Sequence, residues 1–176
     1  IPASIAQCTQ LTTLNLAHNS LDGRIPSKIL TISTLSKELD LSNNYLSGRM
    51  PDEVGSLLHL KKINMSNNRL TGNIPSTLGQ CVDLEYLEMQ NNFFAGRIPQ
   101  TFSNLVSIKH MDISGNNLSG KVPEFLKSLK SLQGLNLSFN HFDGAVTTGG
   151  VFDIAGAVSI EGNDHLCTII PTRGMS

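Results

Sequence analysis

Residues 60–83 read LKKINMSNNRLTGNIPSTLGQCVD, and this 24-residue phrase occurs six times along the chain of 176 residues. Its pattern is L-x-x-L-x-L-x-x-N-x-L-x-G-x-I-P-x-x-L-x-x-L-x-x. Self-similarity at such a fixed period predicts a solenoid, in which each repeat buries its apolar edge only against its neighbours. The six repeats begin at Leu11, Leu35, Leu60, Leu84, Ile108 and Leu132.

Two further slots of the repeat are filled every time. The asparagine slot holds Asn19, Asn44, Asn68, Asn92, Asn116 and Asn140, and we expect these amides to form a structural ladder. The glycine slot holds Gly23, Gly48, Gly72, Gly96, Gly120 and Gly144, where a positive φ or close packing is expected. Six leucine patterns in register, with both slots filled, indicate a leucine-rich-repeat solenoid of the α/β class.

The leucines of each repeat predict one short strand. Apolar residues in the fourth and sixth slots alternate with polar ones, which is the period of a half-buried strand. Successive strands are expected to form one parallel sheet on the inner, concave face, followed by a short helical turn after each Ile-Pro pair. The inward residues are Leu14 and Leu16, Leu39 and Leu41, Ile63 and Met65, Leu87 and Met89, Met111 and Ile113, and Leu135 and Leu137.

The repeats divide the chain into four segments. We expect a truncated partial repeat at residues 1–10, six repeats at 11–148, a cap-like segment at 149–167 that abandons the repeat, and a tail at 168–176. Repeat two has one extra residue among Ser36, Lys37 and Glu38, which predicts a bulge or a widened loop before its strand. Because Ile1-Pro2 corresponds to the middle of a repeat, we expect a fragment of a longer ectodomain.

The composition argues against several classes of function. With 15% charged residues and a formal net charge of -1, a nucleic-acid-binding footprint is not indicated. No apolar run approaches the roughly 18 residues that a membrane-spanning helix needs, and no signal peptide is apparent. No metal or cofactor motif is present. His110, Asp112 and Ser114 alternate on one strand, but their spacing of about 6.5–7 Å does not make a catalytic relay, so we expect no enzyme.

The three cysteines predict two core thiols and one unpaired cysteine. Cys8 and Cys81 occupy the same repeat slot, which is apolar in the other repeats. Three stacked coils would separate them by roughly 14–15 Å, which is too far for a disulfide. Cys167 lies outside the repeats, so its partner is either lost or on another chain.

The Gly-x-Ile-Pro repeats and the ending from Gly149 to Cys167 resemble plant leucine-rich-repeat receptor kinases. The similarity is strongest to the immune-receptor subgroup that includes the rice bacterial-blight-resistance and flagellin receptors. It implies a right-handed superhelix on the extracellular side of the plasma membrane, which recognises a pathogen- or plant-derived ligand. It also implies a co-receptor kinase ectodomain, which would contact a side carrying Phe139, His141 and Phe152.

Outward slots of repeats three to five predict a partner-binding patch of mixed charge. A patch of this kind around a tyrosine suits a protein or peptide ligand better than an apolar small molecule, although a merely solvated face remains the alternative. The patch is Lys61, Lys62, Glu85, Tyr86, Glu88, Lys109, His110 and Asp112.

Three Asn-x-Ser sequons are candidates for glycosylation. Asn117 is expected beside the turn and is the best acceptor, whereas Asn64 and Asn136 would point onto the concave face. A second function stays open from the sequence, that of a secreted inhibitor or decoy that binds a pathogen cell-wall hydrolase such as a polygalacturonase. Proteins of that type have paired cysteines at both caps, which this chain lacks.

Overall fold

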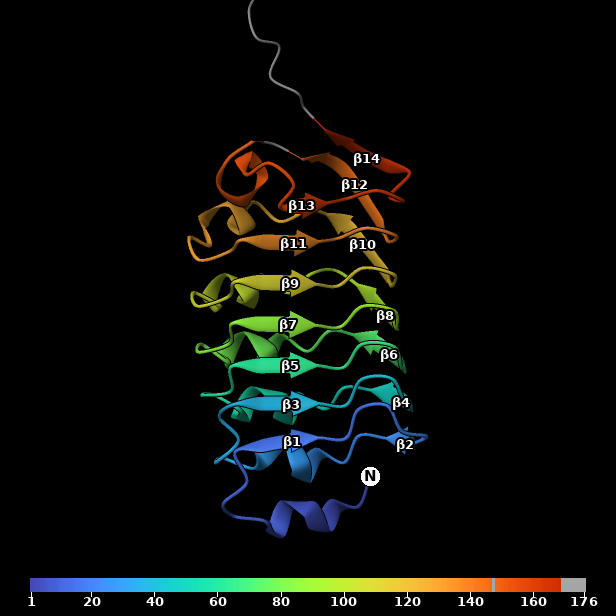
Figure 1. Ribbon diagram of the computed structural model, residues 1–176. Coiled ribbons are helices and arrows are strands. Elements are labelled where there is room, and N and C mark those ends of the chain that lie inside the picture. The colour runs from blue at the N-terminus through green and yellow to red at the C-terminus, as the bar shows by residue number, and fades with distance from the viewer. Residues whose placement is uncertain (147, 169–176) are drawn as a thin grey trace, which may run out of the picture.

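The computed structural model describes residues 1–146 and 148–168, with Thr168 described by its backbone alone. The chain winds through coils that stack in sequence order along one axis (Figure 1). A regular coil contains a short strand, a turn, a second short strand and a 3-10 helix. The solenoid expected from the repeats is therefore confirmed.

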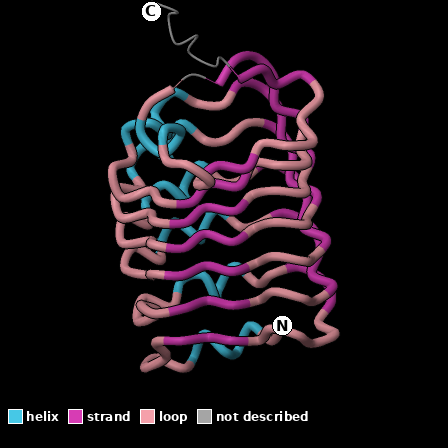
Figure 2. The backbone as a smooth tube through the Cα atoms, turned by 45° about the horizontal axis from the view of Figure 1, so that its top comes forward, coloured by secondary structure: helices cyan, strands magenta, loops and turns pink. Residues whose placement is uncertain are grey.

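Two parallel sheets of seven strands run the length of the stack. Figure 2 shows the two rows of strands joined by the turns, with the helices along another side. Sheet A contains β1 (Thr13–Asn15), β3 (Glu38–Asp40), β5 (Lys62–Asn64), β7 (Tyr86–Glu88), β9 (His110–Asp112), β11 (Gly134–Asn136) and β13 (Val158–Ser159). Sheet B contains β2 (Asp22–Arg24), β4 (Tyr45–Arg49), β6 (Arg69–Asn73), β8 (Phe93–Gly96), β10 (Asn117–Lys121), β12 (His141–Val146) and β14 (His165–Thr168).

The helical turns after the Ile-Pro pairs are 3-10 helices. A proline precedes six of the seven, with φ near the value that its ring imposes, for example -61° at Pro75. The helices are η1 (Ala3–Gln7), η2 (Ser27–Thr31), η3 (Asp52–Ser56), η4 (Ser76–Gln80), η5 (Gln100–Asn104), η6 (Glu124–Ser128) and η7 (Gly150–Asp153).

Aliphatic side chains fill the space between the sheets and the helices. All of the predicted inward residues are buried except Leu16, which is half-buried in the first coil. Phe94, Phe102 and Phe142 are fully buried and supply the largest core side chains. Burial of each such side chain contributes about 1.5–3 kcal/mol before entropy is counted, and every coil adds its own layer of apolar side chains to the core.

The asparagine slot forms the expected ladder. The Asn68 Nδ2 atom donates to the carbonyl oxygens of Met65 and Ser66 in its own coil and, at 2.9 Å, to that of Leu41 in the coil before. Its Oδ1 atom accepts the N–H of Leu46, again from the coil before, at 3.0 Å. One amide thus satisfies buried backbone groups of two coils at once.

Sheet B was not anticipated from the sequence. The glycine slot lies within its strands, where Gly72 has a φ of +78° and Gly48 pairs with Leu70 of the next coil. The stem of Arg49 lies over Gly72, where an added Cβ would come within 2.9 Å of the Arg49 Cγ atom. The missing side chain therefore permits both the positive φ of Gly72 and the packing of Arg49 from the coil before.

One expectation about the ends of the chain is wrong, namely that Cys8 is a core thiol. Residues 149–167 continue the repeat as a seventh coil, because Asn163 fills the asparagine slot and bonds the carbonyl oxygen of Leu137 in the coil before. The strands β13 and β14 then extend sheets A and B. Cys8 is exposed, since among the described residues no coil packs on its side of the first turn. The predicted tail lies outside the described residues from 169 onward.

Cys81 is buried as expected, and its thiol lies 3.3 Å from the carbonyl oxygen of Val54. Desolvation by burial raises its pKa to about 12. Cys8, Cys81 and the exposed Cys167 are all free in the described part of the chain. The extra residue of repeat two lies ahead of β3, where the N–H groups of Ser36 and Lys37 both bond the carbonyl oxygen of Thr12.

Replacing Asn68 with alanine is expected to lower the free energy of unfolding by at least about 2 kcal/mol, because buried backbone groups at Leu41 and Leu46 lose their partners. The measurement is urea-induced unfolding followed by circular dichroism. The matched control is Asn19→Ala, since Asn19 is exposed and bonds only carbonyl groups of its own coil. Equal losses for the two variants would contradict the inter-coil role of the ladder.

Candidate functional site

The predicted patch is brought together on the solvent-facing side of sheet A, called here the sheet A face. In the register of the sheet, Lys62 pairs with Tyr86 and Tyr86 with His110, while Glu88 pairs with Asp112. Lys61, Glu85 and Lys109 immediately precede these strands, so all eight residues of the patch lie on three adjacent coils.

Ion pairs hold the lysines of the patch. The Lys62 Nζ atom lies between Glu38, at 3.3 Å, and Glu88, at 3.8 Å. Partial burial lowers the pKa of Lys62, but the Glu88 and Glu38 carboxylates outweigh this effect and leave it raised. Lys109 contacts Glu85 at 2.6 Å, and this hydrogen bond lowers the pKa of the Glu85 carboxyl and raises that of Lys109. Lys61 is 3.8 Å from the same carboxylate.

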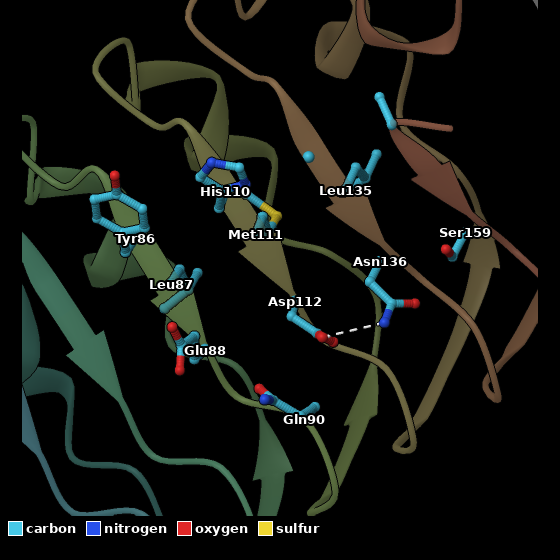
Figure 3. Close-up of a pocket in the computed structure, with 12 residues that line it drawn as sticks. Tyr86, Leu87, Glu88, Gln90, His110, Met111, Asp112, Leu135, Asn136 and Ser159 are labelled. Atoms are coloured by element: carbon cyan, nitrogen blue, oxygen red, sulfur yellow. Dashed lines mark hydrogen bonds between the residues drawn. The ribbon is translucent and has the colours of Figure 1, made fainter. Parts of the chain in front are cut away.

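An aromatic pair stands beside this network. The rings of Tyr86 and His110 are stacked, with centroids 5.4 Å apart and an interplanar angle of 12° (Figure 3). The next residue in this row is Gly134, where an added Cβ would lie 2.6 Å from the His110 Nδ1 atom. The stack therefore extends toward a position that has no side chain.

The central row of the sheet A face is less exposed than its sequence predicts. Asp40 and Asn64 are buried, at 8% and 9% exposure. The reason is a local turn, in which the Asp40 carboxylate and the Asn64 amide accept the backbone N–H two residues later, at Ser42 and Ser66. The predicted patch residue Asp112 makes the same turn with Ser114 and also accepts a hydrogen bond from Asn136.

Repeat four departs from this turn. It has Glu88 and Gln90 where its neighbours have Asp or Asn followed by Ser. Glu88 is longer and reaches Lys62 instead of folding back. The Oε1 atom of Gln90 is buried without a hydrogen-bond partner. The departure places two long polar side chains on the sheet A face at one point along the stack.

These features surround a cavity of about 530 Å³. Sequence reasoning named Tyr86, Glu88, His110 and Asp112 in its wall but missed Gln90, Gly134 and Ala157. Gln90 could have been found from the sequence as an exception to the repeat, because its slot is serine in four other repeats. The lining residues are Tyr86, Leu87, Glu88, Gln90, His110, Met111, Asp112, Gly134, Leu135, Asn136, Ala157 and Ser159.

The three residues of the predicted co-receptor side do not form one patch. Phe139 is 60% exposed at a φ of +53°, in the turn ahead of the exposed His141 on β12. Phe152 is half-buried on η7, beside Lys127 of η6. Figure 1 shows η7 and β12 on opposite sides of the last coils.

The side chains of His110, Asp112 and Ser114 do not contact one another in the order that a catalytic relay requires. The Ser114 hydroxyl donates to Asp112 at 2.6 Å within the turn, whereas the His110 ring packs on Tyr86. Within residues 1–146 and 148–168, no cluster of three or more His, Cys, Asp or Glu side chains is arranged to hold a metal ion. The helices of this part of the chain are too short and too polar to cross a membrane.

The leucine rich repeat model matches residues 35–94 and 98–142, and a second model of the same repeat matches residues 10–31. No curated protein matches the chain. Among solved structures, it is similar to the ectodomain of the receptor kinase SOBIR1 from Arabidopsis thaliana, with a TM-score of 0.64 and 34% identity over 70% of this chain and 68% of that one.

Two other neighbours show the range of this fold. The Arabidopsis receptor kinase HAESA, solved in complex with the peptide hormone IDA and the co-receptor SERK1, has a TM-score of 0.62 and 32% identity over 83% of this chain and 28% of that one. A plant ice-binding protein has a TM-score of 0.69 and 28% identity over 95% of this chain and 61% of that one. The chain spans 27% of the plant peptide hormone receptor RGFR1 and 28% of HAESA in these two complexes.

In a plant secretory expression system, we expect a glycan at Asn117 and none at Asn64 or Asn136. Asn117 is exposed, whereas the side chains of Asn64 and Asn136 are engaged by Ser66 and Ser138 in the local turns. Intact-mass analysis before and after glycosidase treatment checks this, with Asn117→Gln as the control that removes the added mass. A glycan that persists in the variant would contradict the assignment.

Proposed function

The chain belongs to the leucine-rich-repeat family, and we propose that it is a non-enzymatic recognition module of a plant cell-surface receptor, which binds a protein or peptide on the sheet A face. Its likeness to receptor kinase ectodomains supports this proposal, and one of these is solved with a peptide hormone and a co-receptor. Because the same fold also serves an ice-binding protein, the fold alone does not decide the function.

The observation that carries the proposal is that charged and aromatic residues of the sheet A face are concentrated on coils three to five. Charged side chains there are fixed by ion pairs around the Tyr86–His110 stack, beside a cavity large enough for peptide side chains. Pre-ordered charged and aromatic side chains around a desolvated centre are typical of protein recognition sites.

Three finer features belong to the same proposal. The ligand is derived from a pathogen or from the plant itself, and the module serves in immunity on the outer side of the plasma membrane. A co-receptor ectodomain contacts the last coils, where the exposed Phe139 and His141 flank the buried Asn140 in the chain. The similarity of the repeat and of its ending to immune receptors supports these features.

No observation favours the alternative of a secreted inhibitor of a cell-wall hydrolase. Such inhibitors have paired cysteines at both caps, whereas Cys8, Cys81 and Cys167 are free in the described part of the chain. A polygalacturonase inhibition assay with the purified protein separates the two functions, because a receptor module leaves the hydrolase active.

The double variant Lys62→Glu with Glu88→Lys is expected to lose partners that the wild-type protein captures from pathogen secretions or plant extracts. The double variant keeps the net charge. It places a carboxylate at position 62 on β5, directly beside Glu38 on β3. Capture is measured by affinity purification and quantitative mass spectrometry.

The matched control is Glu53→Lys with Lys130→Glu, which also keeps the net charge and changes two exposed residues away from sheet A. Both double variants should unfold within about 1 kcal/mol of the wild-type protein, since partly exposed ion pairs contribute little. A partner captured equally by all three proteins would remove the sheet A face from the proposal.

A further inference from the structure

We propose that the cavity at the end of the Tyr86–His110 stack binds a planar cation, namely the guanidinium group of an arginine side chain in the ligand. This inference rests on the proposed function, since it assigns a chemical class to the ligand of the sheet A face. It specifies which group of a peptide enters the cavity and which side chains hold it.

The first argument is the shape of the wall. Tyr86 covers one side of the His110 ring, and beyond the ring the row continues with Gly134, next to the small Ala157. All five earlier residues of this row have side chains, namely Thr13, Glu38, Lys62, Tyr86 and His110. Beyond the His110 ring, the cavity is therefore open to a further flat group.

Gly134 is needed for space and not for its backbone. Its φ is not in the left-handed region, unlike those of the glycines in the turns. A residue with a side chain would accept this strand conformation, but its Cβ would lie 2.6 Å from the His110 Nδ1 atom. The absent side chain therefore leaves the His110 ring in its stacked position and the cavity open.

The second argument is the charge of the lining residues. Two carboxylates, those of Glu88 and Asp112, line the cavity, and none of its lining residues is a lysine or an arginine. The nearest lysine contact is that of Lys62 with Glu88 at 3.8 Å, which is a loose ion pair that is shared with Glu38. These two carboxylates would repel an anionic ligand group, whereas they would attract a cation.

The third argument is the excess of hydrogen-bond acceptors. The Gln90 Oε1 atom is buried and has no partner, and a buried acceptor left in this state is costly. A guanidinium group has five N–H donors and no acceptor, so it suits a cavity whose charged lining groups, the carboxylates of Glu88 and Asp112, are hydrogen-bond acceptors. It also stacks on aromatic faces, which a compact ammonium group does less well.

The test uses the full chain and three small probes at pH 7.5: Nα-acetyl-arginine amide, the neutral isostere Nα-acetyl-citrulline amide, and Nα-acetyl-lysine amide. Titrations follow the NMR signals of the His110 and Tyr86 rings. We expect the arginine probe to bind with a dissociation constant on the order of millimolar, at least about tenfold more tightly than citrulline and more tightly than lysine.

Three changes should abolish or weaken the response to arginine. Gly134→Leu fills the cavity and His110→Ala removes the stacking face, and each should lower the affinity by about tenfold or more. Glu88→Gln with Asp112→Asn removes the charges, while asparagine keeps the turn, as Asn64 and Asn136 show in their own repeats. Thr13→Leu is the matched control, because it enlarges an exposed residue of the same row far from the cavity.

Equal affinity for arginine and citrulline, or an undiminished response in Gly134→Leu and His110→Ala, would overturn the inference. Circular dichroism of each variant shows whether a loss of binding is due to misfolding. If Gly134→Leu misfolds, His110→Ala provides the test of the inference, because His110 is exposed and its replacement should leave the fold intact. The proposed function is tested separately by partner capture with the Lys62 and Glu88 variant. A partner lost from that variant, with no arginine binding by the wild type, would leave the function standing and remove only the guanidinium site.

Discussion

The structure depends on one recurring hydrogen-bond group, the asparagine amide that joins each coil from the second onward to the coil before it. A solenoid coil is too small to satisfy its own turn, because the chain bends sharply while its backbone polar groups are out of reach of water. The amide of Asn140, for example, bonds the carbonyl oxygen of Ile113 at 3.0 Å and accepts the N–H of Leu118. The leucine layers add apolar burial, and the amide links neighbouring coils beside the backbone hydrogen bonds of sheets A and B.

This constraint explains which parts of the fold could be predicted from the sequence. Leucine, asparagine and glycine recur because every coil faces the same packing problem, so the stack and sheet A could be predicted. Sheet B could not, since its residues around Gly72 show no alternation and owe their pairing to the stacking itself. The seventh coil was missed because Val158 and Ile160, at the end of the stack, are only half-buried and depart from the leucine pattern.

The candidate site, in contrast, is formed by residues that depart from the repeat. Residues that follow the repeat, such as Asp40 and Asn64, are withdrawn from the surface by their own turns. Residues that break it, such as Glu88, Gln90 and Gly134, reach or open the sheet A face. Sequence reasoning found the charged half of the site because outward slots can be counted. It missed the cavity because an absent side chain and an unpartnered amide become visible only when neighbouring coils are placed side by side.

Because Cys81 is buried, the rate at which its thiol is alkylated measures how often the middle coils open. A thiol whose pKa is raised to about 12 and whose sulfur is packed against Val54 reacts with alkylating reagents only when the coils around it separate. Cys8 and Cys167 are exposed toward the two ends of the stack and are open to such reagents throughout. The three labelling rates would therefore distinguish fraying of the ends from rupture of the centre, without any engineered probe.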